Sequence, residues 1–114
     1  MTETLPLTIT ELTACCEPIA KEPISAENAE QLAAKLKAIA DPARLRLISL
    51  LAASKDSEAC VHDLTGLMDL TQGTVSHHLK VLRDAGIVAA DKRGTWVHYS
   101  VVQGALAELS SFLD

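Results

Sequence analysis

The chain has 114 residues, of which 48% are hydrophobic and only three are aromatic, and its formal net charge is −5. This size suits one domain with a modest core, to which a dimer interface would add useful stability. No stretch is long and apolar enough to span a membrane, and the first residues form neither a basic nor an apolar leader. We therefore expect a soluble, cytoplasmic protein without a membrane partner.

Proline separates an N-terminal segment, residues 1–24, from the rest of the chain. Three of the four prolines lie in it, and they allow at most a short helix over 8–16, because proline blocks or ends helices. The adjacent pair Cys15 and Cys16 lies at the end of that short helix. We treat 1–24 as a separate segment that carries this cysteine pair.

Two helices are predicted next, from Ser25 to about Ala40 and from Pro42 to about Ala53. Ser25 and Asp41 are good N-caps, and proline suits the first turn of a helix. Apolar residues recur at helical spacing in both, which marks the faces that the helices bury. These residues are Leu32, Leu36 and Ile39 in the first helix and Leu45, Ile48 and Leu51 in the second.

A polar loop over 54–58 leads to two further helices joined by a tight turn. The first covers 61–68, the turn covers 69–71, and Thr71 caps the second, which Gly86 ends. The buried face of the second helix is predicted to hold Val75, Leu79 and Leu82. This is the layout of a helix-turn-helix, whose second helix reads the major groove of DNA.

The opposite face of this reading helix carries side chains that can donate to or accept from bases. Those expected to contact base edges are Gln72, Thr74, Ser76 and His77. They lie at the start of the helix, where it would meet the groove. His78 flanks the apolar face and is expected to be a partly buried structural residue. An ordinary surface helix would share the same period, and the segment that follows argues against it.

That segment is a predicted β-hairpin, with a strand over 87–91, a basic turn over 92–95 and a returning strand over 96–101. A basic hairpin directly after a reading helix is a wing. The long cations at the rim of the helix and on the wing are expected to contact phosphates. They are Lys80, Lys92 and Arg93.

A last helix, after residue 101, carries a strong apolar stripe. The stripe consists of Val102, Leu106, Leu109, Phe112 and Leu113. A domain of this size cannot hide the apolar faces of both terminal helices, so we expect a homodimer formed through them. A two-fold dimer would place its reading helices in successive major grooves of an inverted repeat, with half-sites about 10 base pairs apart or at a larger, related spacing.

The acidic net charge is unevenly distributed. Residues 72–100 hold four basic and two acidic residues, a local charge of +2, whereas the rest of the chain is acidic. Positive charge therefore lies where the DNA duplex would bind, and the acidic remainder should weaken non-specific binding by repelling phosphate.

Three runs together resemble the ArsR/SmtB family of small dimeric winged-helix repressors that sense metals or metalloids. They are AIADPARLRL over 38–47, SHHLKVL over 76–82 and WVHY over 96–99. The resemblance covers about residues 30–113. It implies a mainly α fold with a small β-hairpin, in which residues 25–114 form a winged helix-turn-helix domain for DNA binding and dimerisation. It also implies repression at operator DNA, but it leaves the inducer open.

All three cysteines lie in segments that members of this family use for sensing. Besides the N-terminal pair, Cys60 lies in a run that resembles the family's Glu-Leu-Cys-x-Cys-Asp-Leu box, with His62 where the second cysteine would be. An odd number of cysteines in a reducing compartment predicts free thiols rather than a disulfide framework. The plainer alternative is that each cysteine is a small buried apolar residue.

The number of donors bears on the identity of the ion. Trivalent arsenic or antimony takes three thiolates, which Cys15, Cys16 and Cys60 supply, so we expect As(III) or Sb(III) as the inducer. Cadmium, lead or zinc would prefer a fourth donor, for which His62 is the candidate. Residues two apart diverge on a regular helix, so that site would need an extended segment or a helix start. A thiol redox-sensing repressor is a further alternative.

Catalysis is not expected. An adjacent cysteine pair can in principle reduce disulfides or arsenate, but the chain has no Cys-x-x-Cys pair near a βαβ unit and no loop that would cradle an anion. The last helix has no histidine, so the zinc site that some relatives build there has no match. His98 is expected to be an ordinary residue on a strand face. We expect neither an enzyme nor an organic small-molecule substrate.

Overall fold

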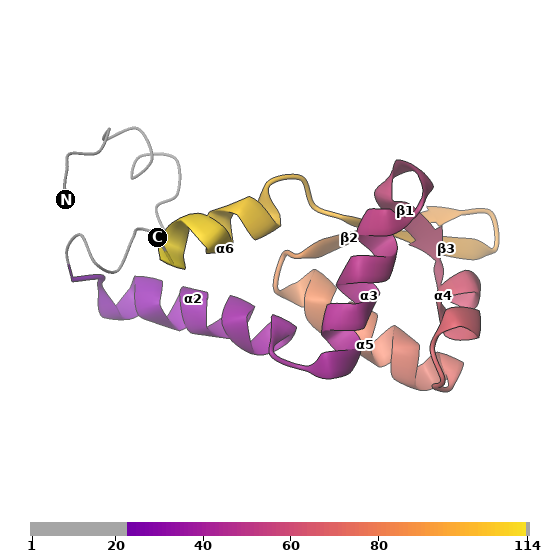
Figure 1. The fold of residues 1–114 in the computed structure, drawn as a ribbon, viewed down its shortest axis with the longest axis horizontal. Helices are drawn as coiled ribbons and strands as arrows, with labels where there is room; N and C mark the ends of the chain where they lie inside the picture. Colours follow the sequence, from indigo (N-terminus) through magenta and orange to yellow (C-terminus); the bar gives the residue numbers. More distant parts are fainter. Residues whose placement is uncertain (1–22, 114) are drawn as a thin grey trace.

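The computed structural model describes residues 23–113; residues 1–22 and 114 lie outside the described part (Figure 1). Its elements, in chain order, are α2 (Ala26–Ile39), α3 (Pro42–Ala53), the short 3-10 helix η2 (Lys55–Ser57), β1 (Glu58–Cys60), α4 (Val61–Leu67), α5 (Gln72–Asp84), β2 (Val88–Arg93), β3 (Trp96–Val101) and α6 (Ala105–Leu113). The predicted helix over 8–16 and the Cys15–Cys16 pair therefore lie outside the described residues.

The side chains predicted to cap helices do so. Ser25, Asp41 and Thr71 each accept, through a side-chain oxygen, the backbone N–H three residues ahead, at 3.0 to 3.2 Å. Each cap satisfies one of the donors that the start of a helix leaves unpaired. At the other end of α5, Gly86 has a φ of +80°, which a residue with a side chain rarely adopts. The predicted limits of α2, α3 and α5 are thereby confirmed.

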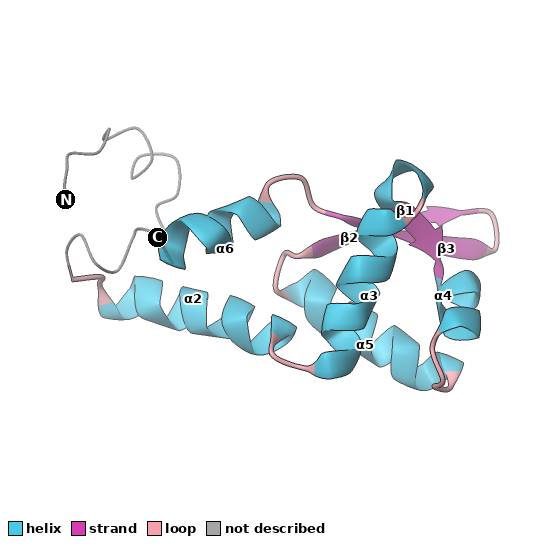
Figure 2. Cartoon of the chain, viewed as in Figure 1, coloured by secondary structure: helices cyan, strands magenta, loops and turns pink. Residues whose placement is uncertain are grey.

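The helices form two groups (Figures 1 and 2). The helices α3, α4 and α5 pack with the sheet at one end of the molecule, and α2 and α6 lie side by side at the other end. Leu32 of α2 and Phe112 of α6 form a small apolar cluster there, with Ile24 and Leu36 packed against it. No helix of residues 23–113 is both long and apolar enough to cross a bilayer.

The buried face of α5 is the one that its periodicity predicts. Val75, Leu79 and Leu82 are each 0% exposed. They belong to the main core, to which Leu64 of α4 and Tyr99 of β3 also contribute. The core thus holds α5 against α4 and the sheet, while the polar start of α5 faces outward.

The predicted inward face of α3 is wrong in one position. Ile48 and Leu51 are buried, but Leu45 is 52% exposed and Leu47 takes its place at 0%. The sequence PARLRLISLLAA is apolar at most positions, so helical periodicity alone fits more than one face. Contact with α5 and the sheet selects the face that holds Leu47.

The sheet has three antiparallel strands in the order β1-β3-β2, one more than the predicted hairpin. The added strand β1 occupies residues 58–60, which the sequence predicts to be loop and helix entry. It has only three residues and is defined by its pairing with β3. Local sequence patterns do not predict such a long-range contact. At the tip of the hairpin, β2 runs as far as Arg93, so the turn is shorter than predicted.

The last helix differs from the prediction in where it begins and in which of its apolar residues are exposed. It begins at Ala105, after Gly104 with a φ of +85°, and not directly after the wing. Leu109 is buried within the main core of its own chain. Val102 and Leu106 are 36% and 38% exposed and remain available to a partner. The side chain of Leu113 lies outside the described part.

Candidate nucleic-acid interface and thiol site

The start of α5 presents the side chains that are predicted to contact base edges. Gln72 is the first residue of the helix and is exposed, as are Thr74 and His77, while Ser76 is half-buried. Amide, hydroxyl and imidazole groups can all hydrogen-bond to base edges in a major groove. The structure thus places the four residues on one helix start, and the base contacts themselves stay a prediction.

Thr74 is partly engaged within the protein. Its backbone N–H binds Thr71 Oγ1, and the two hydroxyl oxygens lie 2.9 Å apart. Thr71 Oγ1 donates in that second hydrogen bond, so the Thr74 hydroxyl keeps its own proton to donate. This contact orients one side chain of the reading face before any DNA is present.

Two of the three predicted phosphate-binding cations already have acidic partners. Lys80 Nζ lies 3.2 Å from Asp84 Oδ2 one helical turn ahead. Arg93 binds Asp91 Oδ2 at 2.8 Å and both carboxylate oxygens of Glu58. The hydrogen bonds that Arg93 donates to these two carboxylates, that to Glu58 first, raise the pKa of Arg93. Exposed pairs of this kind are weak, so a phosphate can compete for either cation.

Lys92 differs from both of them. It is exposed on β2, next to Arg93 in the chain, and it forms no ion pair with any residue from 23 to 113. Its charge is therefore fully available at the wing.

Polar contacts from two other helices hold α5 in place. Lys35 Nζ of α2 donates to the carbonyl of Ala85, just past the end of α5, at 3.3 Å. Arg44 of α3 donates from Nε to the carbonyl of Ala38 at 2.6 Å, and its Nη1 lies 3.2 Å from His78 Nδ1. Arginine has no acceptor, so His78 Nδ1 accepts. The prediction that His78 is a partly buried structural residue is confirmed.

Cys60 ends β1, immediately before α4, as a half-buried free cysteine. His62, in the first turn of α4, is exposed, and its ring lies 5.5 Å from that of Trp96, tilted by 48°. No three His, Cys, Asp or Glu side chains converge to hold a metal ion within the described residues. A site built on Cys60 therefore needs donors from outside them, and Cys15 and Cys16 are the predicted ones.

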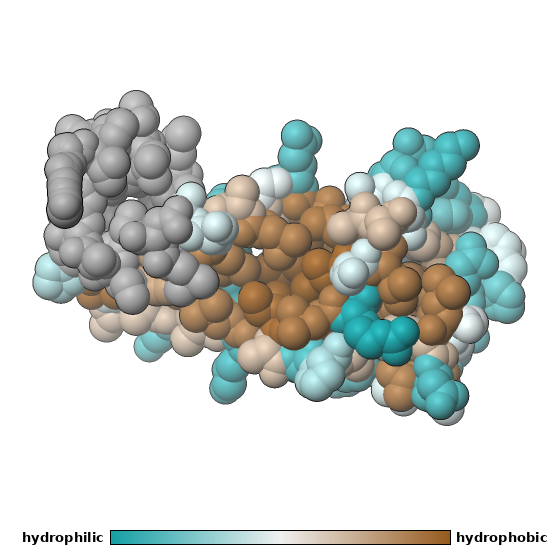
Figure 3. Space-filling view, in the orientation of Figure 1, coloured by the Kyte–Doolittle hydropathy of each residue, from teal (hydrophilic) through white to brown (hydrophobic). Residues whose placement is uncertain are grey.

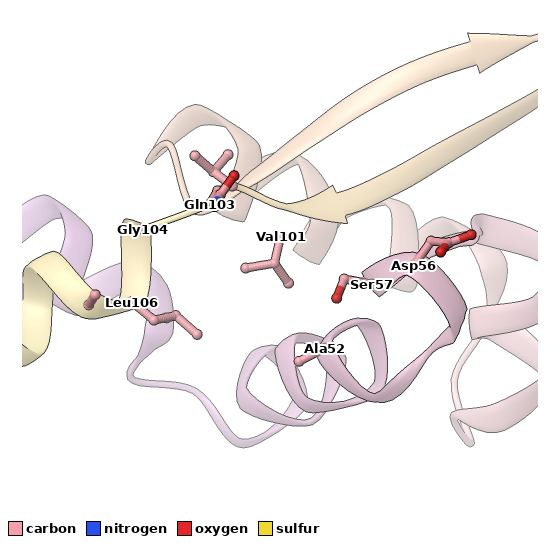
Figure 4. A pocket seen from close by; sticks show the side chains of 9 residues that line it. Ala52, Asp56, Ser57, Val101, Gln103, Gly104 and Leu106 are labelled. Atoms are coloured by element: carbon pink, nitrogen blue, oxygen red, sulfur yellow. The ribbon is translucent and has the colours of Figure 1, made fainter.

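An open cavity of about 440 Å³ lies between the end of α3, the η2 turn and the start of α6 (Figure 4). Its lining includes Ala52, Val101 and Leu106, and Asp56 is the only carboxylate among the lining residues within 23–113. None of the described residues that line it carries a thiol or an imidazole, so they offer a soft ion no suitable donor.

Sequence reasoning missed two residues, Glu58 and His98. Glu58 was assigned to a loop and His98 to an unremarkable strand face, yet β1 brings both next to functional positions. Glu58 holds Arg93 of the wing, and His98 is the register partner of Cys60. The only available signal was the pairing of β1 with β3, which requires the tertiary structure.

Comparison with known proteins identifies the family. Residues 41–90, from the cap of α3 into β2, match the family described as "Bacterial regulatory protein, arsR family". The arsenical resistance operon repressor of Bacillus subtilis is 38% identical over 78 residues, which are 65% of this chain and 72% of that repressor. The chain belongs to the ArsR/SmtB family.

Two further relatives extend this ArsR/SmtB assignment. The cadmium resistance regulator CadC homolog of Staphylococcus aureus is 33% identical over 82 residues, covering 72% of this chain and 66% of that protein. The solved homodimeric winged helix-turn-helix DNA-binding domain of a possible ArsR-family regulator from Mycobacterium bovis has a TM-score of 0.66 and 30% identity. It covers 74% of this chain and 75% of that one. This ArsR/SmtB chain is thus a DNA-binding transcriptional repressor, and not an enzyme.

Proposed function

We propose that this repressor binds an inverted-repeat operator as a homodimer and releases it when As(III) or Sb(III) binds the thiolates of Cys15, Cys16 and Cys60. The observation that carries the proposal is the position of Cys60, a free thiol at the junction between β1 and α4. Two relatives, from Bacillus subtilis and Escherichia coli, are arsenical resistance operon repressors. Such a repressor works in the cytoplasm, where its operator is.

Dimerisation uses the terminal helices. Exposed Val102 and Leu106 support this, as does the gathering of hydrophobic side chains over α6, α3 and the adjoining part of α2 on the face shown in Figure 3. The solved relative from Mycobacterium bovis is homodimeric. A two-fold axis through this face would set the two α5 helices for half-sites about 10 base pairs apart, or a related spacing.

Each subunit reads DNA through the start of α5 and through its wing. Base edges are contacted by Gln72, Thr74, Ser76 and His77, and phosphates by Lys80, Lys92 and Arg93. The exposure of the helix start and the free charge of Lys92 support this division. The phosphate contacts position the protein, and the base contacts select the sequence.

Release follows from the position of Cys60 at the start of α4. An ion held by Cys60 and the N-terminal cysteines would tie the N-terminal segment to the helix that supports α5. That tie shifts the dimer towards a spacing that fits DNA poorly. A coupling free energy of about 1 to 3 kcal/mol would change operator affinity about 5- to 150-fold.

The test begins by selecting a high-affinity duplex from random sequence. The protein bound to that duplex is then titrated with arsenite, antimonite, cadmium, lead and zinc while DNA release is followed. Arsenite and antimonite should release the DNA, and Cys60→Ser should bind the duplex normally without responding. Release by the divalent metals alone would replace this inducer with the divalent alternative, which is supported by the similarity to the CadC homolog.

Oxidation tests the third alternative, in which the cysteines sense the redox state and bind no ion. If a disulfide-forming oxidant releases the DNA in the absence of any ion, and arsenite does not, the protein is a redox sensor and the three-thiolate site is wrong.

A further inference from the structure

The wing cation Arg93 binds a carboxylate that lies outside the wing hairpin. Arg93 ends β2, and its Nη1 and Nη2 lie 2.5 and 3.4 Å from the two carboxylate oxygens of Glu58, the first residue of β1. A guanidinium holds a phosphate through the same paired N–H groups that here hold a carboxylate. Glu58 thus occupies the part of Arg93 that a phosphate would use.

The hairpin forms without this contact. In the sheet order β1-β3-β2, Glu58 lies on one edge strand and Arg93 on the other. The ladder of the hairpin runs from Val88 opposite Val101 to Arg93 opposite Trp96, and Glu58 takes no part in it. An exposed ion pair adds little to the stability of a fold. The Glu58–Arg93 pair is therefore better explained by its effect on what Arg93 can bind.

The two partners differ in how freely they can turn towards DNA. The side chain of Arg93 is 51% exposed, whereas that of Glu58 is 27% exposed. When Arg93 leaves for a phosphate, Glu58 stays behind, and no other cation of residues 23–113 pairs with it. A carboxylate left alone beside a phosphate backbone is unfavourable, because like charges repel across an interface. Binding DNA through Arg93 thus requires the loss of an ion pair.

We propose that Glu58 competes with DNA phosphate for Arg93 and thereby limits the affinity of the repressor for any duplex. The inference rests on the proposed function in one respect, since it takes Arg93 as a phosphate contact. Glu58 holds the guanidinium in the free protein, and a phosphate displaces it on DNA. Phosphate contacts carry no sequence information, so Glu58 lowers specific and non-specific affinity by the same factor.

A carboxylate that only oriented Arg93 would have the opposite effect, because removing its charge would weaken DNA binding. The contacts favour competition. Each of the three guanidinium nitrogens donates to a carboxylate, Nη1 and Nη2 to Glu58 and Nε to Asp91. An orienting residue would leave Nη1 and Nη2 to the phosphate.

The test compares full-length Glu58→Gln with the wild type by fluorescence anisotropy, on a selected and a random duplex at several salt concentrations. Glutamine keeps the length of the side chain and removes its charge. Affinity for both duplexes should rise roughly two- to fivefold for each wing that engages, as expected when one weak ion pair no longer competes. The slope of log K against log salt concentration should steepen by up to about one per wing.

Asp56→Asn is the matched control. It removes one negative charge two residues before Glu58, from an exposed side chain that forms no ion pair within residues 23–113. Asp56 has a φ of +58°, a conformation that asparagine tolerates. The control measures the effect of net charge alone and should gain less affinity. A Glu58→Gln protein that binds DNA no more tightly than Asp56→Asn would overturn the proposal.

Arg93→Ala separates this inference from the proposed function. It should weaken DNA binding more in the Glu58→Gln background than in the wild type, because only there is Arg93 free before DNA arrives. An equal loss in both backgrounds contradicts the competition and leaves Arg93 as a phosphate contact. No loss in either background removes the phosphate contact itself, and the competition with it.

A second measurement uses the wild type alone, with ¹⁵N-labelled arginine and ¹³C-labelled glutamate. NMR should show the Arg93 guanidinium in contact with Glu58 in the free protein and with a ³¹P nucleus of the backbone in the saturated complex. A contact with Glu58 that persists in the saturated complex contradicts the proposal, however stable the variants are.

Discussion

The two adjacent cations of the wing, Lys92 and Arg93, differ in their surroundings. Arg93 shares its charge with Glu58 and Asp91, whereas Lys92 has no acidic partner among residues 23–113. Counterion release depends on charge that reaches the phosphates. The two residues should therefore contribute unequally to DNA affinity, although the sequence presents them as equivalent.

Lys92→Ala should weaken binding to all DNA sequences by similar factors. The slope of log K against log salt concentration should fall by about one, as expected for one lost phosphate contact. Fluorescence anisotropy on selected and random duplexes at several salt concentrations measures both effects. Lys37→Ala, which removes an exposed lysine from α2, is the control. A loss confined to the selected duplex would place Lys92 at a base edge instead.

The base-reading residues should show the opposite behaviour. The double variant Gln72→Ala/His77→Ala removes two exposed groups from the start of α5 without touching the core. Affinity for the selected duplex should fall, at about 1 to 3 kcal/mol for each good base contact, while affinity for random DNA stays nearly constant. An unchanged ratio of specific to non-specific affinity, in a variant with an unaltered circular dichroism spectrum, would remove this assignment.

At the scale of elements, sequence patterns predicted the helices whose limits and faces depend on residues close to one another in the chain. Caps and periodicity located α2, α3 and α5, because Ser25, Asp41 and Thr71 act within their own first turns. Two features needed tertiary contacts: the inward face of α3, where Leu47 replaces Leu45, and the strand β1. The interface with DNA divides similarly, since motifs identified Arg93 of the wing but not its partner Glu58, which lies on the strand β1.

The cap of α3 makes the stability of the protein depend on pH. The backbone N–H of Arg44 lowers the pKa of Asp41 below its usual value, and desolvation partly opposes this shift. A carboxylate whose pKa is lower in the folded state stabilises the fold above its unfolded pKa, about 4. That contribution disappears as the pH falls through the folded pKa.

Asp41→Asn should therefore flatten the acid side of the stability profile. Asparagine caps helices as well as aspartate does, so the cap should survive while its titration is lost. Urea unfolding between pH 6 and pH 3 measures the free energy of unfolding for both proteins. The free energy of unfolding of the wild type should fall relative to that of the variant as the pH drops from 6 to 3, because only Asp41 titrates. A constant difference over that range would show that Asp41 does not titrate with folding.

At the scale of the whole molecule, the structure shows which residues can be substituted to test the dimer interface. Leu109 belongs to the core of its own chain, so charging it would damage folding and association together. Leu106 is 38% exposed on the same helix. Leu106→Glu should place a charge in the apolar contact between subunits and weaken the dimer strongly, unless the carboxylate escapes to water.

Sedimentation velocity at micromolar concentration measures this effect. Leu67→Glu is the matched control, because Leu67 is 60% exposed on α4, away from the terminal helices. The first variant should sediment as a monomer and the second as a dimer. A Leu106→Glu protein that remains dimeric would move the interface to another face.

The arrangement of the thiols in the dimer decides how an ion can act on both subunits. We expect Cys15 and Cys16 of one subunit to meet Cys60 of the other, because a proline-containing linker joins the N-terminal segment to α2. Mixing a Cys15→Ser/Cys16→Ser chain with a Cys60→Ser chain tests this.

Each homodimer alone lacks a complete site and should not bind arsenite. A cross-subunit site is restored once in every heterodimer, so mixing should recover up to one arsenite per heterodimer, whereas a site within one chain recovers none. Absence of recovery, with heterodimers confirmed by mass spectrometry, would rule out bridging and leave the three-thiolate assignment to the single Cys→Ser variants.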